Sequence, residues 1–318
     1  MTPPLKIVFF GSSDFSLPLL ESCLVSSHKL VGVVTTPDRP KGRGLRTQPN
    51  PVKEQCEKSG VLTLAPVTLK EVEAREKVRS LQPDLFVVAS YGKLIPEAWL
   101  GVPRKAALNI HPSLLPKYRG AAPIPWQILN GEKMTGVTIA LVTKDLDAGD
   151  IVHQLRVPLE ENETTASLTD RLAQLGRKAL EETFLKLEKG NWDRVPQKES
   201  EASYARKLSK TDGYLDINES ALDLERRIRA FHPWPGAFIG FRKIPLRILE
   251  AKVDSIACAE AKPGALLEVS SKGFLRLQAG RGSLQILKVQ LPGRRPVSGG
   301  EFAHGQRLKV GGSFENLR

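Results

Sequence analysis

Short apolar runs alternate with amphipathic stretches up to about residue 190, and this alternation is the strongest constraint on the fold. The runs predicted as strands cover 6–10, 30–36, 61–65, 84–90, 106–110, 136–142 and 150–159. The stretches predicted as helices cover 15–26, 50–59, 69–81, 122–130 and 165–189. Thr164 or Thr165 is expected to cap the last helix, and Gly190 to end it. Such alternation favours a mostly parallel sheet with helices on both faces. The sequence therefore predicts an α/β, Rossmann-like domain over residues 1–190.

The pattern changes beyond this point. Residues 191–220 are polar and mixed and are predicted to be a linker, and 221–230 is predicted to be a short charged helix. Closely spaced strands are then predicted at 237–241, 246–253, 265–269, 274–278 and 284–291, with a final helix over 298–306. Short strands with Gly or Pro at most breaks indicate a small OB-like β-barrel domain over residues 221–318. The length agrees, because single hydrophobic cores stop growing near about 250 residues.

The net charge of +12 is unevenly distributed. Residues 206–318 hold 20 Lys and Arg against 11 Asp and Glu, whereas residues 1–205 hold 27 against 24. A basic second domain beside a nearly neutral first one indicates a polyanionic partner, although a basic surface can also serve solubility alone. Eight basic residues of this domain are expected to face such a partner as a set: Arg226, Arg227, Arg229, Lys288, Arg294, Arg295, Arg307 and Lys309.

The cysteines and the hydropathy pattern limit the compartment. Cys23, Cys56 and Cys258 are odd in number and widely spaced, so neither a disulfide framework nor a zinc site is indicated. No apolar run is long enough to cross a membrane, and the stretch at residues 7–10 is too short for a signal segment. We expect a cytoplasmic protein, acting as a monomer, with no metal and no membrane partner.

The stretch from Ala107 to Pro123 carries the chemistry. Asn109 and His111 stand two residues apart at the end of a predicted strand, so their side chains point to the same face. In open α/β sheets, ligands bind where strands end. Asp147 adds a carboxylate between two later strands. A donor amide, an imidazole and a carboxylate are the parts of an acyl-transfer site, although a capping Asn beside a structural His has the same spacing.

Two further segments bear on the ligands. The turn after the first strand, Gly11-Ser-Ser-Asp14, lacks the second and third glycines of the dinucleotide-binding pattern, so NAD binding is not supported. The segment 39–46 holds four basic residues among eight, and such a loop cannot bury itself. Its cations suit phosphate groups, although a charge run is often only a solvated surface. These residues are Arg39, Lys41, Arg43 and Arg46.

Several motifs together carry a resemblance to a known family. Asn109-x-His111-x-Ser113-Leu114-Leu115-Pro116, followed by Leu146-Asp147-x-Gly149, resembles the signature of the folate-dependent formyltransferases. The basic loop with Pro51-Val-Lys53, and the later Tyr204-Ala-Arg-Lys and His232-Pro-Trp-Pro-Gly236, resemble the methionyl-tRNA formyltransferase family. The resemblance covers nearly the whole chain.

The resemblance implies a reaction and a set of sites. Members of the family move a formyl group from 10-formyltetrahydrofolate to the α-amine of methionine on initiator methionyl-tRNA. Asn109, His111 and Asp147 would be catalytic, and Arg43 would enter the acceptor end of the tRNA. The loop of Ser113, Leu114, Leu115 and Pro116 would contact the folate, together with 87–91 and 143–147.

Three alternatives stay open at this point. The same catalytic domain suits a small formyl acceptor such as a nucleotide sugar, although the basic loop and the barrel argue against it. A hydrolase that releases formate is the second alternative. A non-catalytic nucleic-acid-binding protein is the third, and the presence of Asn109, His111 and Asp147 together speaks against it.

Overall fold

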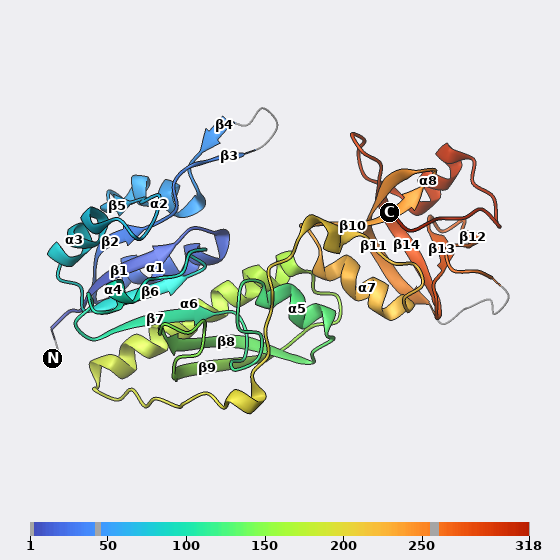
Figure 1. Cartoon of the computed structure of the whole chain (residues 1–318). Coiled ribbons are helices and arrows are strands. Elements are labelled where there is room, and N and C mark those ends of the chain that lie inside the picture. The colour runs from blue at the N-terminus through green and yellow to red at the C-terminus, as the bar shows by residue number, and fades with distance from the viewer. Residues whose placement is uncertain (1–2, 42–45, 255–260, 318) are drawn as a thin grey trace. The chain divides into compact units, whose positions relative to one another are not determined.

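The computed structural model describes residues 3–41, 46–254 and 261–317 (Figure 1). The chain forms two compact units. The first comprises Met1–Pro123, Lys133–Leu159 and Leu168–Arg206, and the second comprises Ile124–Glu132, Glu160–Ser167 and Lys207–Arg318. Within the described ranges, no helix combines the length and the apolar character needed to cross a membrane.

The first unit is built on a seven-stranded sheet with the order β5-β2-β1-β6-β7-β8-β9. Its strands are β1 (Lys6–Gly11), β2 (Lys29–Val34), β5 (Thr63–Leu64), β6 (Leu85–Ala89), β7 (Ala106–His111), β8 (Met134–Leu141) and β9 (Ile151–Pro158). From β5 to β7 all neighbours are parallel, as predicted. The chain turns back from β7 into β8 and again into β9, so this edge is antiparallel.

Helices cover both faces of this sheet. They are α1 (Leu17–Val25), α2 (Pro51–Ser59), α3 (Val72–Ser80), α4 (Glu97–Leu100) and α6 (Thr165–Glu188), with a short 3-10 helix η1 at Asp14–Ser16. On one face, Phe10 of β1 and Phe86 of β6 pack with Val78 of α3 and Trp99 of α4 in one apolar core. The Phe10 and Trp99 rings meet edge to face, with centroids 5.9 Å apart.

The opposite face brings α6 unusually close to β7. A Cβ atom on Gly176 of α6 would lie 3.3 Å from Ile110 Cγ2 and 3.5 Å from Leu19 Cδ2, so the glycine permits this approach. Ile110 therefore points toward α6. Because side chains alternate along a strand, Asn109 and His111 on either side of Ile110 point to the other face.

Local sequence sets the ends of two helices as predicted. Thr164 Oγ1 accepts a hydrogen bond from the Ser167 backbone N–H at 3.3 Å, which caps α6. Gly190, two residues past the end of α6, has a φ of 72°, a conformation that favours glycine. Helix α8 (Gly299–Gln306) begins with a capping box formed by Ser298 and Glu301.

The second unit holds an antiparallel sheet with the order β10-β11-β14-β13-β12, and β15 pairs with β14. Its strands are β10 (Ala237–Phe241), β11 (Ile244–Asp254), β12 (Leu266–Val269), β13 (Leu275–Gln278), β14 (Ser283–Gln290) and β15 (Val297–Ser298). Its helices are α5 (Pro123–Leu129), which begins one residue before this unit, α7 (Ala221–Ala230) and α8.

Residues near the C-terminus join the two edges of this sheet. Glu315 bridges Gly240 of β10, and Ser313 bridges Ala265 just before β12. Phe314 between them turns inward to Phe241, with ring centroids 5.5 Å apart. The sheet thus closes around one apolar core. The predicted architecture, an α/β Rossmann-like domain followed by a small β-barrel, is confirmed.

Two segments differ from a simple loop or linker. The basic segment includes a two-stranded antiparallel pair, β3 (Arg39–Lys41) and β4 (Arg46–Gln48). The predicted linker contains the short 3-10 helices η2 (Glu199–Glu201) and η3 (Lys210–Gly213). Its first part, through Arg206, belongs to the first unit, where Val195 exchanges both backbone hydrogen bonds with Ile151.

Candidate active site

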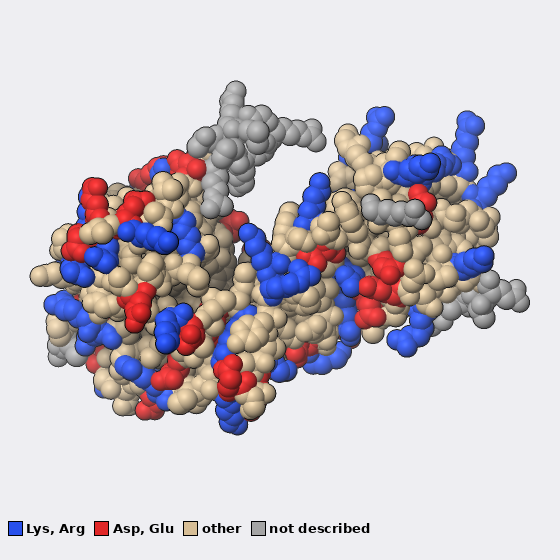
Figure 2. All heavy atoms as spheres, in the orientation of Figure 1, with Lys and Arg blue, Asp and Glu red and all other residues tan. Residues whose placement is uncertain are grey.

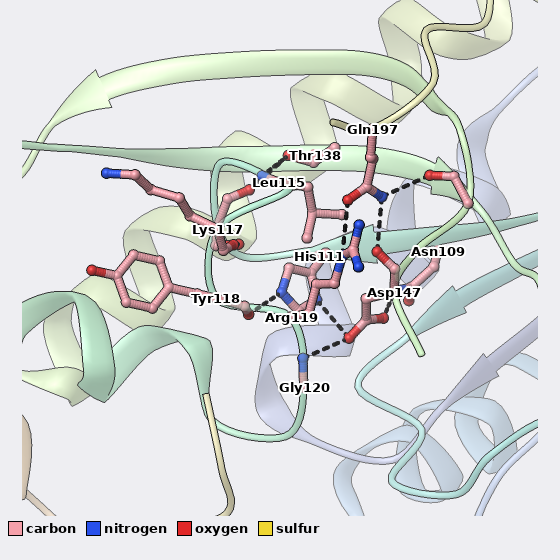
Figure 3. A network of polar contacts seen from close by, with 12 residues as sticks. Asn109, His111, Leu115, Lys117, Tyr118, Arg119, Gly120, Thr138, Asp147 and Gln197 are labelled. Carbon is pink, nitrogen blue, oxygen red and sulfur yellow. Dashed lines mark hydrogen bonds and ion pairs between the residues drawn. The ribbon is translucent and has the colours of Figure 1, made fainter. Parts of the chain in front are cut away.

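Strand β7 delivers Asn109 and His111 at the edge of the sheet where the parallel strands have their carboxyl ends. His111 is only 4% exposed and pairs across the sheet with Thr138 of β8. Figure 3 shows both side chains pointing toward Asp147, which comes from the loop between β8 and β9. The structure therefore brings the three residues predicted to be catalytic into one cluster.

The imidazole of His111 is oriented by a backbone carbonyl. Its Nε2 lies 2.9 Å from the Tyr118 carbonyl oxygen. A carbonyl oxygen only accepts hydrogen bonds, so Nε2 must carry a hydrogen. Its Nδ1 lies 3.7 Å from Asp147 Oδ2, an ion-pair contact that is too long for a hydrogen bond. The ring nitrogen available for chemistry is therefore Nδ1, on the side of the carboxylate.

The carboxylate of Asp147 is the centre of the cluster. Its Oδ1 accepts a hydrogen bond from Asn109 Nδ2 at 2.9 Å, and its Oδ2 accepts one from the Gly120 backbone N–H at 2.8 Å. The backbone of Asp147 has a φ of 52°, which is uncommon for a residue other than glycine. Asp147 thus fixes which way the Asn109 amide faces, because a carboxylate accepts only from its N–H groups.

The loop predicted to contact folate is tied to strands β8 and β9. Thr138 Oγ1 donates to the Ser113 carbonyl at 2.7 Å and accepts from the Leu115 N–H at 3.1 Å. Gln154 Nε2 donates to the Leu115 carbonyl at 3.1 Å. Ser113 and Leu115 are buried, whereas Leu114 and Pro116 are half-buried. The loop therefore has a fixed shape with an apolar outer side.

Sequence reasoning missed two polar residues beside Asp147. Gln197 donates to the backbone carbonyls of Asp147 and Gly149, and Arg119 donates to Gln197 (Figure 3). Arg119 is only 2% exposed, although the sequence places it in a predicted surface loop close to the exposed Lys117, so no signal in the sequence distinguished it. No signal marked Gln197, which stands 50 residues from Asp147 in a polar segment.

The basic hairpin is anchored at its base. Lys53 Nζ contacts both carboxylate oxygens of Asp38, at 2.7 and 2.8 Å, and this hydrogen bond raises the pKa of Lys53. Asn50 caps α2 and donates to the Thr36 carbonyl at 2.9 Å. Three of the residues predicted to contact tRNA lie in its strands, Arg39 and Lys41 in β3 and Arg46 in β4; Arg43 lies outside the described residues.

Two basic residues of the predicted set form ion pairs with carboxylates of the same unit. Arg227 pairs with Glu219 and Arg229 pairs with Glu225, so these charges are compensated within the unit. That they face a polyanion together with the rest of the set stays a prediction. On the face drawn in Figure 2, Lys and Arg predominate over this unit, whereas they alternate with Asp and Glu over the first.

A cavity of about 640 Å³ lies on the second unit between the end of β14, β15 and α8. Arg294 and Arg295 line it together with the apolar side chains of Leu291, Val297 and Phe302. It offers two guanidinium groups and one carboxylate, that of Glu301, on a partly apolar floor. The two guanidinium groups suit phosphate and sugar–phosphate groups.

The two described cysteine thiols are protonated and therefore poor nucleophiles. Cys23 and Cys56 are free and buried, and burial raises the pKa of both, which keeps them protonated. Cys258 lies outside the described residues. Across the described part of the chain, no three His, Cys, Asp or Glu side chains are grouped to hold a metal ion.

A parallel sheet with helices on both faces and a polar cluster at the carboxyl ends of its strands place this chain in the class of Rossmann-like α/β proteins. The same fold occurs in an N-formyltransferase from Helicobacter canadensis in complex with folinic acid and dTDP-3-aminofucose, with a TM-score of 0.68 and 16% identity over 89% of this chain and 98% of that one. It also occurs in HypX from Aquifex aeolicus in complex with tetrahydrofolic acid, with a TM-score of 0.63 and 16% identity over 97% of this chain. This chain spans only 48% of HypX.

Sequence comparisons are more specific. Residues 5–184 match the Formyl transferase family, and residues 207–307 match Formyl transferase, C-terminal domain. A methionyl-tRNA formyltransferase of Sulfurihydrogenibium sp. is 37% identical over 98% of this chain and the whole of that protein. One of Marinobacter nauticus is 41% identical over 95% of this chain and 96% of that protein. The chain therefore belongs to the formyl transferase family and, within it, to the methionyl-tRNA formyltransferases.

Proposed function

We propose that this protein transfers the formyl group of 10-formyltetrahydrofolate to the α-amine of methionine on initiator methionyl-tRNA, which gives N-formylmethionyl-tRNA. The observation that carries the proposal is the cluster of Asn109, His111 and Asp147 at the end of β7. The names of the most similar relatives agree with it.

The cluster provides for the charge that develops during transfer. Attack of the amine on the formyl carbon places negative charge on the formyl oxygen. Asn109 Nδ2 carries two hydrogens, and one is used by Asp147, so the second can donate to that oxygen. His111 can donate from Nδ1 when that nitrogen is protonated, because Nε2 is already committed to the Tyr118 carbonyl.

The same cluster provides for proton transfer. The amine must lose a proton and the departing folate nitrogen must gain one. Asp147 is a carboxylate beside His111 Nδ1, with a side chain that is 12% exposed. Its Oδ2 faces Nδ1 at 3.7 Å. It also lies where an ordered water molecule could accept the proton of the amine.

The loop from Ser113 to Pro116 is proposed to bind the folate. A pterin ring is flat and apolar on its faces, with donors and acceptors along one edge. Leu114 and Pro116 offer apolar surface, while Ser113 and Leu115 anchor the loop through Thr138. In this proposal the anchored residues set the shape of the loop and the half-buried residues touch the ring.

The basic hairpin and the second unit are proposed to bind the tRNA. Arg39, Lys41, Arg43 and Arg46 would contact the acceptor end, and the cavity beside Arg294 and Arg295 would take part of the phosphate backbone. Binding should therefore weaken steeply as salt is added, through counterion release. We further propose that the protein acts as a monomer in the cytoplasm, where charged tRNA is available.

A direct assay tests the function. Purified protein is given 10-formyltetrahydrofolate with charged initiator tRNA, with a charged elongator tRNA, or with an amino-sugar nucleotide. The proposal expects N-formylmethionine from the initiator tRNA far above the other two acceptors. Formylation of the sugar nucleotide alone would indicate a small-acceptor enzyme, and release of formate without any acceptor would indicate a hydrolase.

A further inference from the structure

The backbone around Asp147 is held by one side chain from a distant segment. Gln197 Nε2 donates to the Asp147 carbonyl at 2.8 Å and to the Gly149 carbonyl at 2.7 Å. Asp147 itself has a φ of 52°. This conformation is uncommon for a residue other than glycine, and hydrogen bonds to the neighbouring backbone help to hold it. The two hydrogen bonds from Gln197 are therefore in the right place to fix the direction of the Asp147 carboxylate.

The amide of Gln197 is itself oriented by Arg119. Arg119 Nε donates to Gln197 Oε1 at 3.1 Å, and the other end of the guanidinium pairs with Glu199 at 2.8 Å. Carbonyl oxygens only accept and a guanidinium only donates, so the Gln197 amide has a single orientation that satisfies all its partners. Arg119 is 2% exposed, so this orientation is protected from competing water.

The backbone of Arg119 is fixed as firmly as its side chain. Its N–H donates to the Ser203 carbonyl at 2.8 Å, and its carbonyl accepts from the Ala205 N–H at 2.7 Å. The residues on either side both touch the catalytic cluster. Tyr118 accepts from His111 Nε2, and Gly120 donates to Asp147 Oδ2.

Position 120, next to Arg119, requires glycine. Gly120 has a φ of 114°, and a Cβ there would lie 2.9 Å from the Ala205 carbonyl oxygen.

We infer that Arg119 and Gln197 are positioning residues that set the distance and angle between the Asp147 carboxylate and the His111 imidazole. Figure 3 shows the Gln197 amide against the main chain of Asp147 and the Arg119 guanidinium next to that amide. Neither residue is among those proposed to touch the reacting groups, and the inference rests on the function proposed above. A positioning role predicts a loss of turnover with little loss of substrate binding.

The decisive variant is Gln197→Glu. The substitution keeps the length of the side chain, and one carboxylate oxygen can still accept from Arg119. The other carboxylate oxygen then replaces the Nε2 amide group and faces the carbonyl oxygens of Asp147 and Gly149, to which it cannot donate. A displacement of about 1 Å in a catalytic group can cost about 10² in rate. We expect kcat to fall about 10²-fold, with KM for folate and for tRNA each within about threefold of the wild type.

Two matched substitutions serve as controls. Lys198→Gln alters the neighbouring residue, which is 75% exposed and pairs only with Glu201 among the ion pairs of the described residues. It should leave both kinetic constants unchanged. Gln154→Glu repeats the same chemical change at a glutamine that holds the folate loop through Leu115 and Thr138. It should mainly raise KM for folate.

A second measurement does not depend on activity. The ring ¹⁵N signals of His111 report its hydrogen bonds and its titration, so they should move in Gln197→Glu and stay in place in Lys198→Gln. The inference is overturned if the signals and kcat stay at wild-type values. It is also overturned if Gln154→Glu produces the same changes. If Gln197→Glu does not fold, as judged by circular dichroism, Gln197→Met is measured against the same criteria.

The two readouts separate the two claims. A wild-type protein that makes no N-formylmethionine contradicts the proposed function, while the His111 signals still decide whether Gln197 positions the cluster. An active wild type with unaltered signals and kcat in Gln197→Glu contradicts the positioning role alone.

Discussion

The substitution Asp147→Asn probes the cluster most sharply, because it keeps the shape of the side chain and removes its charge. The carboxylate accepts from two N–H groups, Asn109 Nδ2 and the Gly120 backbone. An asparagine has only one carbonyl oxygen to replace two acceptors. The backbone N–H of Gly120 cannot turn away, so we expect the new oxygen to face Gly120 and the new NH₂ group to face Asn109.

The cost to stability follows from this arrangement. Two donors facing one another leave a buried group unsatisfied, which costs about 1–3 kcal/mol. Here the Asn109 amide can rotate and offer its own oxygen, so the lower end, about 1 kcal/mol, is expected. The rotation impairs function, because Asn109 then presents its oxygen to the substituted side chain at position 147 and turns its N–H groups away from their wild-type direction.

The effect on activity should be far larger than the effect on stability. The variant loses the charge beside His111 Nδ1 and the orientation of the Asn109 donor together. We expect turnover to fall by about 10²–10⁴, the range for loss of a positioned acid or base. The pH dependence of kcat should also change its form, because the carboxylate 3.7 Å from His111 Nδ1 is gone.

The assay is formylation of charged initiator tRNA across a pH series, with urea denaturation as the stability measurement. Asp193→Asn is the matched control, since this exposed carboxylate belongs to the first unit but lies outside the segments expected to bind substrate. Turnover that falls while the pH profile keeps its form would mean that Asp147 is structural and does not titrate with His111. A variant with near-normal turnover would refute the catalytic assignment of Asp147 altogether.

Three further expectations are simpler to state. His111→Ala should lower turnover by about 10²–10³ while tRNA binding, measured on filters, stays nearly intact; near-normal turnover would rule out its role. Arg43→Ala should impair transfer to initiator tRNA more than folate binding, and initiator tRNA should protect residues 39–48 from proteolysis better than an elongator; equal protection by both would place selectivity elsewhere. Burial lowers the pKa of His28, although Glu188 partly opposes this. The unfolded chain therefore binds the proton more readily, so stability is present above about pH 6.5 and is lost as the pH falls through that value toward the lower folded pKa. His28→Phe, which keeps an aromatic ring against Phe184, should flatten the urea midpoint between about pH 7.5 and 5.5, and an equally steep fall in this variant would contradict the assignment.

Local chemistry explains which parts of the fold were predictable. Helix α7 was predicted at 221–230 and is observed over the same residues, because Ser220 caps its start and its interior contains neither Gly nor Pro. Its ion pair between Glu225 and Arg229 has the i,i+4 spacing of a helix, so the compensation of Arg229 could also have been foreseen. The antiparallel edge formed by β8 and β9 could not, since the strand pattern carries no direction.

Some residues of the candidate site could be predicted from the sequence and others could not. Asn109 and His111 were found because their spacing of two is a property of one strand. Gln197 reaches Asp147 across 50 residues, and a hydrogen bond between distant backbone and side-chain atoms leaves no period or composition in the sequence. Thr138 and Gln154 behave alike, since each holds the loop at Ser113–Pro116 from a strand that follows it.

Electrostatic attraction acts over a longer range than a hydrogen bond, and this difference explains why the basic surface could be predicted and the hydrogen-bond geometry of the site could not. Attraction between a basic surface and a polyanion acts over about 8–10 Å at physiological salt, so it depends on the sum of charges rather than on their exact placement. Such a sum can be counted in a sequence, as the excess of 20 Lys and Arg over 11 Asp and Glu in residues 206–318 shows. Hydrogen bonds of 2.8 Å to a carboxylate are lost when the donor moves away by about 1 Å. The proposed chemistry therefore depends on residues such as Arg119 and Gln197, whose only work is to hold other residues still.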